Sequence, residues 1–242
     1  FRIWDTPCPP LLEHSLIDPA ILPQPCLLGT IQTRICIGMT FFIACNSIYA
    51  IHSHTNTQPF ARSTLMTLAP RRRDEVAWVY VPIQGDIAEF WLNADRRQCF
   101  LFRLGPVRDA FIGPYIMQLS NFVLVKRPLT LTYRKNGPMP ISFLGAYSEE
   151  HRLQITTPPP TKYSPPPSLR NPYFSSASLK HASRVRIFYL PGTKLCRGLI
   201  IQYEDGQRAL GQCRVGIDLV AEYTRPHAGT TRRVPGRPFH LL

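Results

Sequence analysis

Short runs of apolar, β-branched and aromatic residues follow one another along the chain, separated by polar or glycine-containing breaks. Residues 76–81 form one such run, and after a break at residues 84–86 a second run covers residues 87–92. Runs of this length with such breaks are typical of strands joined by turns. No long segment repeats its apolar residues with the 3.6-residue period of an amphipathic helix. The pattern therefore predicts an all-β protein with little helix. Further strands are expected at residues 99–102, 122–125, 129–133, 141–144 and 185–189.

Two stretches far apart in the chain resemble one another. Each begins with Cys-x-Gly, at Cys36 and at Cys196, and continues as an apolar run, a polar break and a second run. Both are expected to form strand, turn and strand. Asp205-Gly206 is a typical two-residue hairpin turn, whereas residues 45–47 do not have the composition of a tight turn. We interpret the two stretches as equivalent structural hairpins of one β-fold, not as two copies of an active site.

Composition along the chain predicts five segments. Residues 1–25 are proline-rich and are expected to form an extended arm, and residues 26–155 form the main β block. Residues 156–172 contain seven prolines and are expected to be a proline-rich linker or a long surface loop. Residues 173–225 supply three or four strands, too few for a separate core, so we expect them to complete the same domain. Residues 226–242 form a basic tail with the composition of a disordered end.

Charge adds a weak expectation about partners. The chain has 242 residues, enough hydrophobic residues (44%) for a core, and a net charge of +13. The basic residues are scattered, with dense spots only at residues 71–73 and in the tail. Weak, non-specific binding to polyanions is therefore expected. No nucleic-acid-binding motif accompanies the charge, so nucleic acid is not the expected partner.

The cysteines favour a reducing compartment. Their number is seven, which precludes complete internal pairing, and none stands in a CxxC pair or at zinc-finger spacing. Most lie in apolar runs, where a free thiol acts as a small buried hydrophobe. A disulfide between the two repeats stays open as an alternative. The odd count and the lack of a signal-peptide pattern favour an intracellular location.

One stretch, residues 35–51, has the length and apolar content of a short membrane span, but it contains Gly38, Asn46 and Ser47. Two buried strands explain it better, because the related C-terminal stretch is clearly not a span. We therefore expect no membrane span.

Candidate chemistry is sparse. His52 and His54 are two residues apart, which places both imidazoles on one side of a strand, so they are the candidate metal ligands. No third ligand lies near them, and a polar strand end is the preferred interpretation. The short motifs of hydrolases, phosphate loops and dinucleotide-binding sites are all missing. We therefore expect no catalytic residue, no metal site and no cofactor. A hydrolase of unrecognised type would need a cleft where carboxylates or these histidines converge.

Three local patterns together resemble the jacalin-related lectins, a β-prism family that binds carbohydrate in its apex loops. They are the hairpin at residues 198–206, the Ile-Gly-Pro-Tyr turn at residues 112–115 and the strand at residues 141–145. The resemblance implies a sugar site in the apex loops. The residues it points to are Tyr115, Gly145, Tyr147 and Glu149. The chain departs from the family in lacking a Gly-Gly pair and in having Glu149 where the family has aspartate.

The chain also resembles fungal proteins that carry Trp-Asp-Thr-Pro near the start, as at residues 4–7, and Ala-Leu-Gly-Gln-Cys-Arg near the end, as at residues 209–214. This resemblance implies no activity. Together these observations predict a β-prism-like or β-sandwich fold built from repeated hairpins. They favour a non-enzymatic module that binds glycans or another protein. The alternative is a structural or protein-interaction module of a larger fungal protein, without a small-ligand site.

Overall fold

The computed structural model describes residues 2–4, 26–93, 99–104, 109–113, 122–135, 137, 139–141, 144–149, 154–156, 175 and 177–224. The described residues form four β-sheets, two short α-helices and one 3-10 turn, Thr33–Ile35. Neighbouring strands are antiparallel except for the first two, which are parallel. The prediction of an all-β protein is therefore confirmed, while the choice between prism and sandwich stays a prediction.

One four-stranded sheet brings the two ends of the main block together. Its order is β1 (Arg2–Trp4), β2 (Cys26–Gln32), β10 (Thr130–Lys135) and β11 (Leu144–Tyr147). The strand expected at residues 141–144 thus begins only at its last residue. Ile141 is buried just before it and donates its N–H to the Ile48 carbonyl.

The five-stranded sheet has the order β12 (Gln154–Thr156), β9 (Phe122–Lys126), β6 (Glu89–Asn93), β7 (Phe100–Arg103) and β8 (Asp109–Ile112). Its inward-facing side chains include three phenylalanines whose ring centroids lie 5.1–5.8 Å apart. They are Phe90, Phe100 and Phe102. Aromatic packing of this kind stabilises a core beyond the area it buries.

The three-stranded sheet has the order β4 (Ser47–His54), β3 (Gly38–Ala44) and β5 (Ala77–Pro82). Every residue of β3 is buried, because both faces of this strand are covered. One face joins the core shared with the other two sheets. The other packs with residues of the segment that contains helices α1 (Arg62–Met66) and α2 (Pro70–Glu75).

The stretch at residues 35–51 therefore forms buried strands, as expected. No helix in the described part of the chain is long and apolar enough to cross a membrane.

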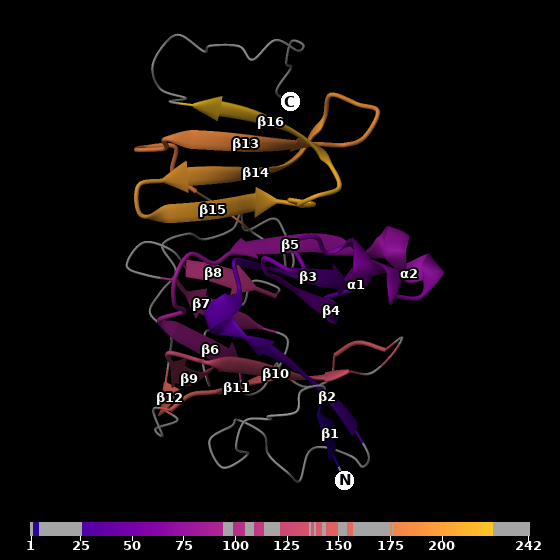
Figure 1. Cartoon of the computed structure of the whole chain (residues 1–242), viewed down its shortest axis with the longest axis vertical. Helices are drawn as coiled ribbons and strands as arrows, with labels where there is room; N and C mark the ends of the chain where they lie inside the picture. Colours follow the sequence, from indigo (N-terminus) through magenta and orange to yellow (C-terminus); the bar gives the residue numbers. More distant parts are fainter. Residues whose placement is uncertain are drawn as a thin grey trace, which may run out of the picture.

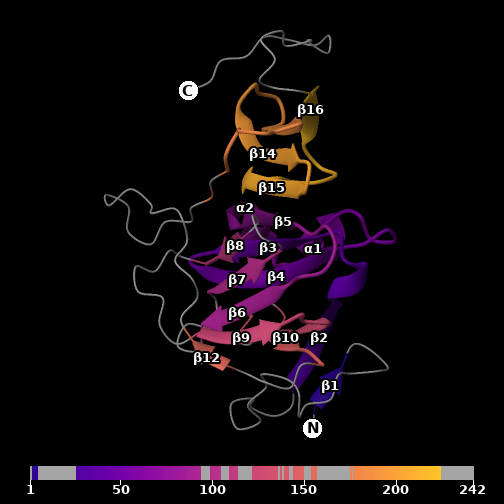
Figure 2. The same ribbon diagram turned by 90° about the vertical axis from the view of Figure 1, so that its left-hand side faces the viewer.

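One hydrophobic core joins these three sheets. Its buried members come from every one of them and include Ile31, Phe41, Phe102 and Leu131. After β2 the chain builds the three-stranded sheet and most of the five-stranded sheet before it returns to the first sheet at β10, so the core is built from residues distant in sequence. Figures 1 and 2 show the strands of the five-stranded sheet following one another along the long axis of the molecule, from β8 near β5 to β12.

The first hairpin has a tighter turn than its composition suggested. Ala44 pairs with Ser47, which leaves a two-residue turn, and both turn residues have positive φ, 48° at Cys45 and 60° at Asn46. Positive φ at both positions is characteristic of type I′ hairpin turns. The expectation for residues 45–47 was wrong because cysteine is not a typical turn residue, although asparagine tolerates this conformation.

The second hairpin belongs to a separate four-stranded sheet. Its order is β15 (Gly206–Gly211), β14 (Cys196–Tyr203), β13 (Arg184–Tyr189) and β16 (Leu219–Thr224). Tyr203 pairs with Gly206, so the two-residue turn lies one position earlier than Asp205-Gly206. The four strands agree with the upper count expected for this segment.

In the Cys-x-Gly motif of both hairpins, the cysteine thiol contacts the carbonyl of the glycine. The Cys36 thiol donates to the Gly38 carbonyl at 2.9 Å, and the Cys196 thiol contacts the Gly198 carbonyl at 3.7 Å. Neither glycine has room for a Cβ: Gly38 lies under the Tyr80 ring, and Gly198 lies against the backbone of the following loop. These contacts agree with the interpretation of the repeats as equivalent structural elements.

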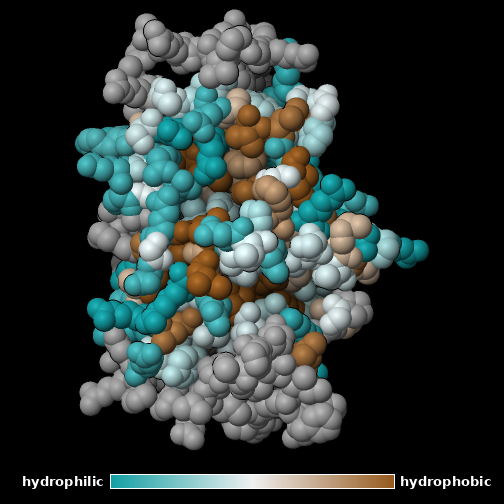
Figure 3. Space-filling view, in the orientation of Figure 1, coloured by the Kyte–Doolittle hydropathy of each residue, from teal (hydrophilic) through white to brown (hydrophobic). Residues whose placement is uncertain are grey.

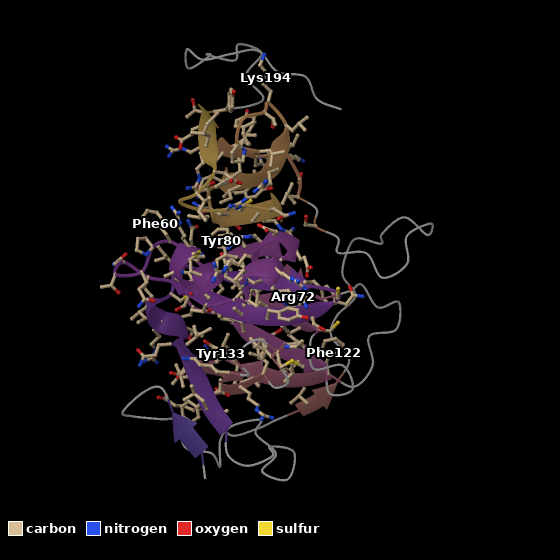
Figure 4. The ribbon with its side chains drawn as sticks, turned by 90° about the vertical axis from the view of Figure 1, so that its right-hand side faces the viewer. Phe60, Arg72, Tyr80, Phe122, Tyr133 and Lys194 are labelled. Atoms are coloured by element: carbon tan, nitrogen blue, oxygen red, sulfur yellow. The ribbon has the colours of Figure 1, made fainter. Side chains whose placement is uncertain are left out.

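The C-terminal sheet lies beside the three-stranded sheet, with β15 next to β5 (Figure 1). A single β-bridge joins Val79 to Gln212, and the Gln212 side chain accepts the Trp78 N–H at 3.3 Å. Tyr80 packs against a small cluster of the C-terminal sheet that includes Phe188, and Figure 4 shows this tyrosine at the junction.

Candidate functional site

The histidine pair was the first candidate. His52 and His54 do lie on one side of β4, with ring centroids 4.7 Å apart, and both are buried. The Nδ1 of His54 lies 2.7 Å from the Pro59 carbonyl, which can only accept, so Nδ1 carries the proton. Its Nε2 then accepts from the Thr40 hydroxyl at 2.7 Å.

His52 is held by the same kinds of hydrogen bond. Its Nε2 donates to the Gln58 carbonyl at 3.2 Å, and its Nδ1 accepts from the Thr64 hydroxyl at 2.8 Å. Burial lowers the pKa of His54 to about 4 and also lowers the pKa of His52. Both rings are therefore neutral at pH 7, with all four nitrogens engaged. The pair holds the 55–60 loop and helix α1 against β4. Within the described residues, no group of three His, Cys, Asp or Glu side chains is placed to hold a metal ion.

The basic run at residues 71–73 is also largely structural. The Arg72 guanidinium lies 4.4 Å from the centre of the Tyr49 ring and pairs with Glu75. Arg73 donates to the Leu68 and Met66 carbonyls at 2.8 and 2.7 Å, at the end of α1. Figure 4 shows Arg72 on the helical side of the main block. Two of the three arginines are thus committed within the protein, which weakens this run as a polyanion-binding site.

The buried thiols are unreactive. Burial raises the pKa of Cys36 to about 11 and that of Cys213 to about 12. Because the thiolate is the nucleophile, these groups are poor nucleophiles at pH 7. Cys36, Cys45 and Cys196 are free thiols, so no disulfide joins the two repeats through them.

The residues of the predicted sugar site are partly placed. Tyr115 lies outside the described residues. Gly145 is buried in β11, Tyr147 is half-buried at the end of that strand, and Glu149 is exposed two residues later. Gly145 and Tyr147 alternate with the core residue Ala146, so they share the outer face of the sheet. Gly145 is directly opposite Thr132, whose hydroxyl is buried without a hydrogen-bond partner. The sugar site stays a prediction.

An ion cluster at the junction of the sheets was not apparent in the sequence. The carboxylate of Asp218 has no solvent exposure, and the guanidinium groups of Arg197 and Arg214 lie 3.5 and 3.6 Å from it. Burial raises the pKa of Asp218 despite the opposing effect of the two arginines. Arg214 also lies over the Trp78 ring at 5.0 Å, so the cluster fixes the loop before β16 to the main block.

Three of the four large hydrophobic side chains that are exposed in residues 177–224 lie at one end of β16, and the fourth is Leu179. The exposed fractions are 72% for Leu219, 46% for Val220 and 53% for Leu195. Leu219 and Cys196 pair with Tyr189 from opposite sides, which brings Leu195 to the same end of the sheet. We call Leu195, Leu219 and Val220 the apolar end. Figure 3 shows hydrophobic side chains exposed over this sheet.

The strand itself is exposed along its whole length. None of the six side chains of β16 is buried, whereas the edge strands β4, β8 and β11 each have buried side chains. Within the described part of the chain β16 has one hydrogen-bonded neighbour, β13, and Figure 1 shows it as the outermost strand of its sheet. An edge of this kind presents backbone N–H and C=O groups that can pair with another strand. We call this side of β16 the open edge.

The open edge lies in a positively charged region. Residues 177–224 contain seven lysines and arginines and four aspartates and glutamates. Two of the acids are already paired, Asp218 with two arginines and Glu222 with Arg184 at 3.1 Å. Lys180 and Lys194 are exposed, and Figure 4 shows Lys194 at the far end of the sheet from the main block.

The described residues thus define an all-β protein with an exposed apolar strand edge. Comparison with protein-family models, curated proteins and solved structures found no match to this chain.

Proposed function

We propose that this chain is a non-enzymatic β-rich binding module that recognises another protein through the open edge of β16. The observation that carries the proposal is the exposure of Leu219, Val220 and Leu195 beside an edge strand with no buried side chain. Soluble proteins usually protect edge strands with charges, prolines or bulges, and they place exposed apolar groups together mainly at interaction sites. The one charged residue of β16, Glu222, is paired with Arg184 at 3.1 Å.

The chemistry of the described residues supports binding over catalysis. The two buried histidines are neutral and hydrogen-bonded on every nitrogen, and the buried thiols have raised pKa values. Nucleophilic catalysis needs an activated nucleophile beside a base. Neither the histidine pair nor these thiols meet that condition.

A site-specific crosslinking experiment tests the proposal. A photoreactive phenylalanine analogue replaces Val220 in one sample and Met139 in a control, since Met139 is 62% exposed on the main block. In extract of the source cells we expect a discrete protein adduct from position 220, lost when Leu219→Lys is added. The proposal is wrong if positions 220 and 139 give the same adducts, or if Leu219→Lys leaves the adduct at position 220 unchanged.

The glycan-binding version of the module rests on the lectin resemblance together with the surface at the end of β11. There Tyr147 offers a ring for stacking on a sugar and Glu149 offers an exposed carboxylate for its hydroxyls. A glycan array followed by calorimetry tests this version. Binding above background that disappears in Tyr147→Ala supports it, and a blank array removes it.

A further inference from the structure

We propose that the partner supplies a short extended segment of net negative charge, which adds to β16 as a fifth strand of the C-terminal sheet. This inference rests on the proposed function and specifies the class of partner. Three properties of the described residues support it: the backbone of β16, the pattern of its side chains and the charge around it.

The first of these properties is the backbone of β16. β16 is antiparallel to β13 over six consecutive residue pairs, from Leu219 opposite Tyr189 to Thr224 opposite Arg184. In an antiparallel pair the residues alternate in the direction of their N–H and C=O groups, so three of the six residues direct these groups to the open edge. An added strand can pair with groups directed to this edge, which is the basis of recognition by β-strand addition.

The side chains of β16 differ between the two faces of the sheet. Leu219, Ala221 and Tyr223 share one face, and they continue an apolar row because they lie opposite Tyr189, Ile187 and Val185 of β13. A partner strand that pairs with them extends the row with apolar residues at every second position. The residue opposite Glu222 on the other face should not be acidic, because like charges directly opposite are destabilising.

The positive charge around β16 favours acidic residues at the other positions of the partner segment. The chain carries +13 in total, and Glu222, the acid of the edge strand, is paired with Arg184. Lys194 is exposed in the turn after β13, close to the Leu219 end of β16. Acidic residues in the partner at this end would approach Lys194. The general attraction also favours a segment of net negative charge.

A second copy of this chain fits the edge less well. Two copies would each carry +13 and would repel one another. A stable dimer also buries about 800 Å² on each partner. The edge of one six-residue strand with three exposed apolar side chains is smaller than that. Short peptides bind by strand addition without a large interface, so an extended segment is the better match.

Selection from a displayed library of random decapeptides tests the inference with the intact chain as bait. We expect the enriched peptides to carry apolar residues at alternate positions and a net negative charge. In fluorescence-polarisation titrations Leu219→Lys should weaken their binding about tenfold, whereas Met139→Lys, a matched exposed position on the main block, should leave it unchanged. Raising the salt concentration should weaken binding further, because exposed charges are screened.

Backbone methylation separates strand addition from other modes. A selected peptide is made with N-methyl groups on its odd residues or on its even residues. The peptide that is methylated on the N–H groups facing β16 should lose binding. The peptide that is methylated on the N–H groups pointing away from β16 should retain it. Equal loss or equal retention in the two series overturns strand addition.

The remaining outcomes separate this inference from the proposed function. Enriched peptides that are basic, that lack alternation or that still bind Leu219→Lys overturn the acidic-strand inference. So does a concentration-dependent dimer of the wild-type chain that Leu219→Lys abolishes. If the adduct at position 220 is formed and no acidic peptide is selected, protein binding stands and only the partner class is wrong. If neither is seen, both proposals fail.

Discussion

Protonation of His54 should make the protein markedly less stable in mild acid. Its folded-state pKa is about 4, against an ordinary value of 6.5, because burial disfavours the charged ring. A depressed pKa means that the stability is fully present above pH 6.5 and is lost as the pH falls towards 4. The linkage relation with these two values gives a loss of about 2 kcal/mol between pH 7 and pH 5, and about 3 kcal/mol by pH 4. The lowered pKa of His52 acts in the same direction.

Urea unfolding followed by tryptophan fluorescence at pH 7, 6 and 5 measures the effect. His54→Asn keeps a donor for the Pro59 carbonyl and removes the titrating ring. This variant should be less stable than the wild type at pH 7. However, it should lose about 2 kcal/mol less between pH 7 and pH 5. His181→Asn, which replaces an exposed imidazole, serves as the control. Equal pH dependence in wild type and His54→Asn would refute the reasoning, as would an NMR titration of the His54 ring with a midpoint near 6.5.

Three further predictions concern packing, the ion cluster and the thiols. Gly38→Ala should lower the unfolding free energy by about 1–3 kcal/mol, because the added Cβ would lie 2.6 Å from a carbon of the Tyr80 ring, and urea unfolding at pH 7 measures this loss. Asp218→Asn should leave the unfolding free energy at pH 7 unchanged or slightly higher in the same assay, because burial disfavours this carboxylate more than the two arginines favour it; a loss of several kcal/mol would contradict this balance. Iodoacetamide should modify the exposed Cys45 in the native protein well before the buried cysteines, and mass spectrometry at increasing urea should show those thiols reacting only with unfolding. The buried cysteines are Cys36, Cys99 and Cys213.

Most strands of the main block could be predicted from the local sequence. The runs at residues 76–81, 122–125 and 129–133 form β5, β9 and β10 with shifts of a residue or two. Their β-branched and aromatic residues favour strands, and polar breaks mark their ends. The helices at α1 and α2 were not singled out, because five or six residues are too few to show a helical period.

The candidate binding surface was not predicted. β16 contains Leu219, Val220, Ala221 and Tyr223, a composition that suggests a buried or half-buried strand. It is exposed because β13 covers only one of its sides and no further described strand pairs with the other. Pairing of this kind depends on residues distant in sequence, so the composition of one strand cannot indicate its place in a sheet.

The histidine pair shows most clearly which properties follow from the local sequence and which depend on the folded structure. Alternation along a strand was enough to place His52 and His54 on one face, because side-chain direction in a strand is a local property. Their chemistry depended on contacts made by folding, with Thr40 from β3, Pro59 and Gln58 from the loop, and Thr64 from α1. The sequence by itself determined most strands of the main block and the direction of their side chains. Only the tertiary structure decided which polar groups are buried and neutral and which apolar strand stays at an open edge, because burial and pairing are set by parts of the chain that meet only in the folded protein.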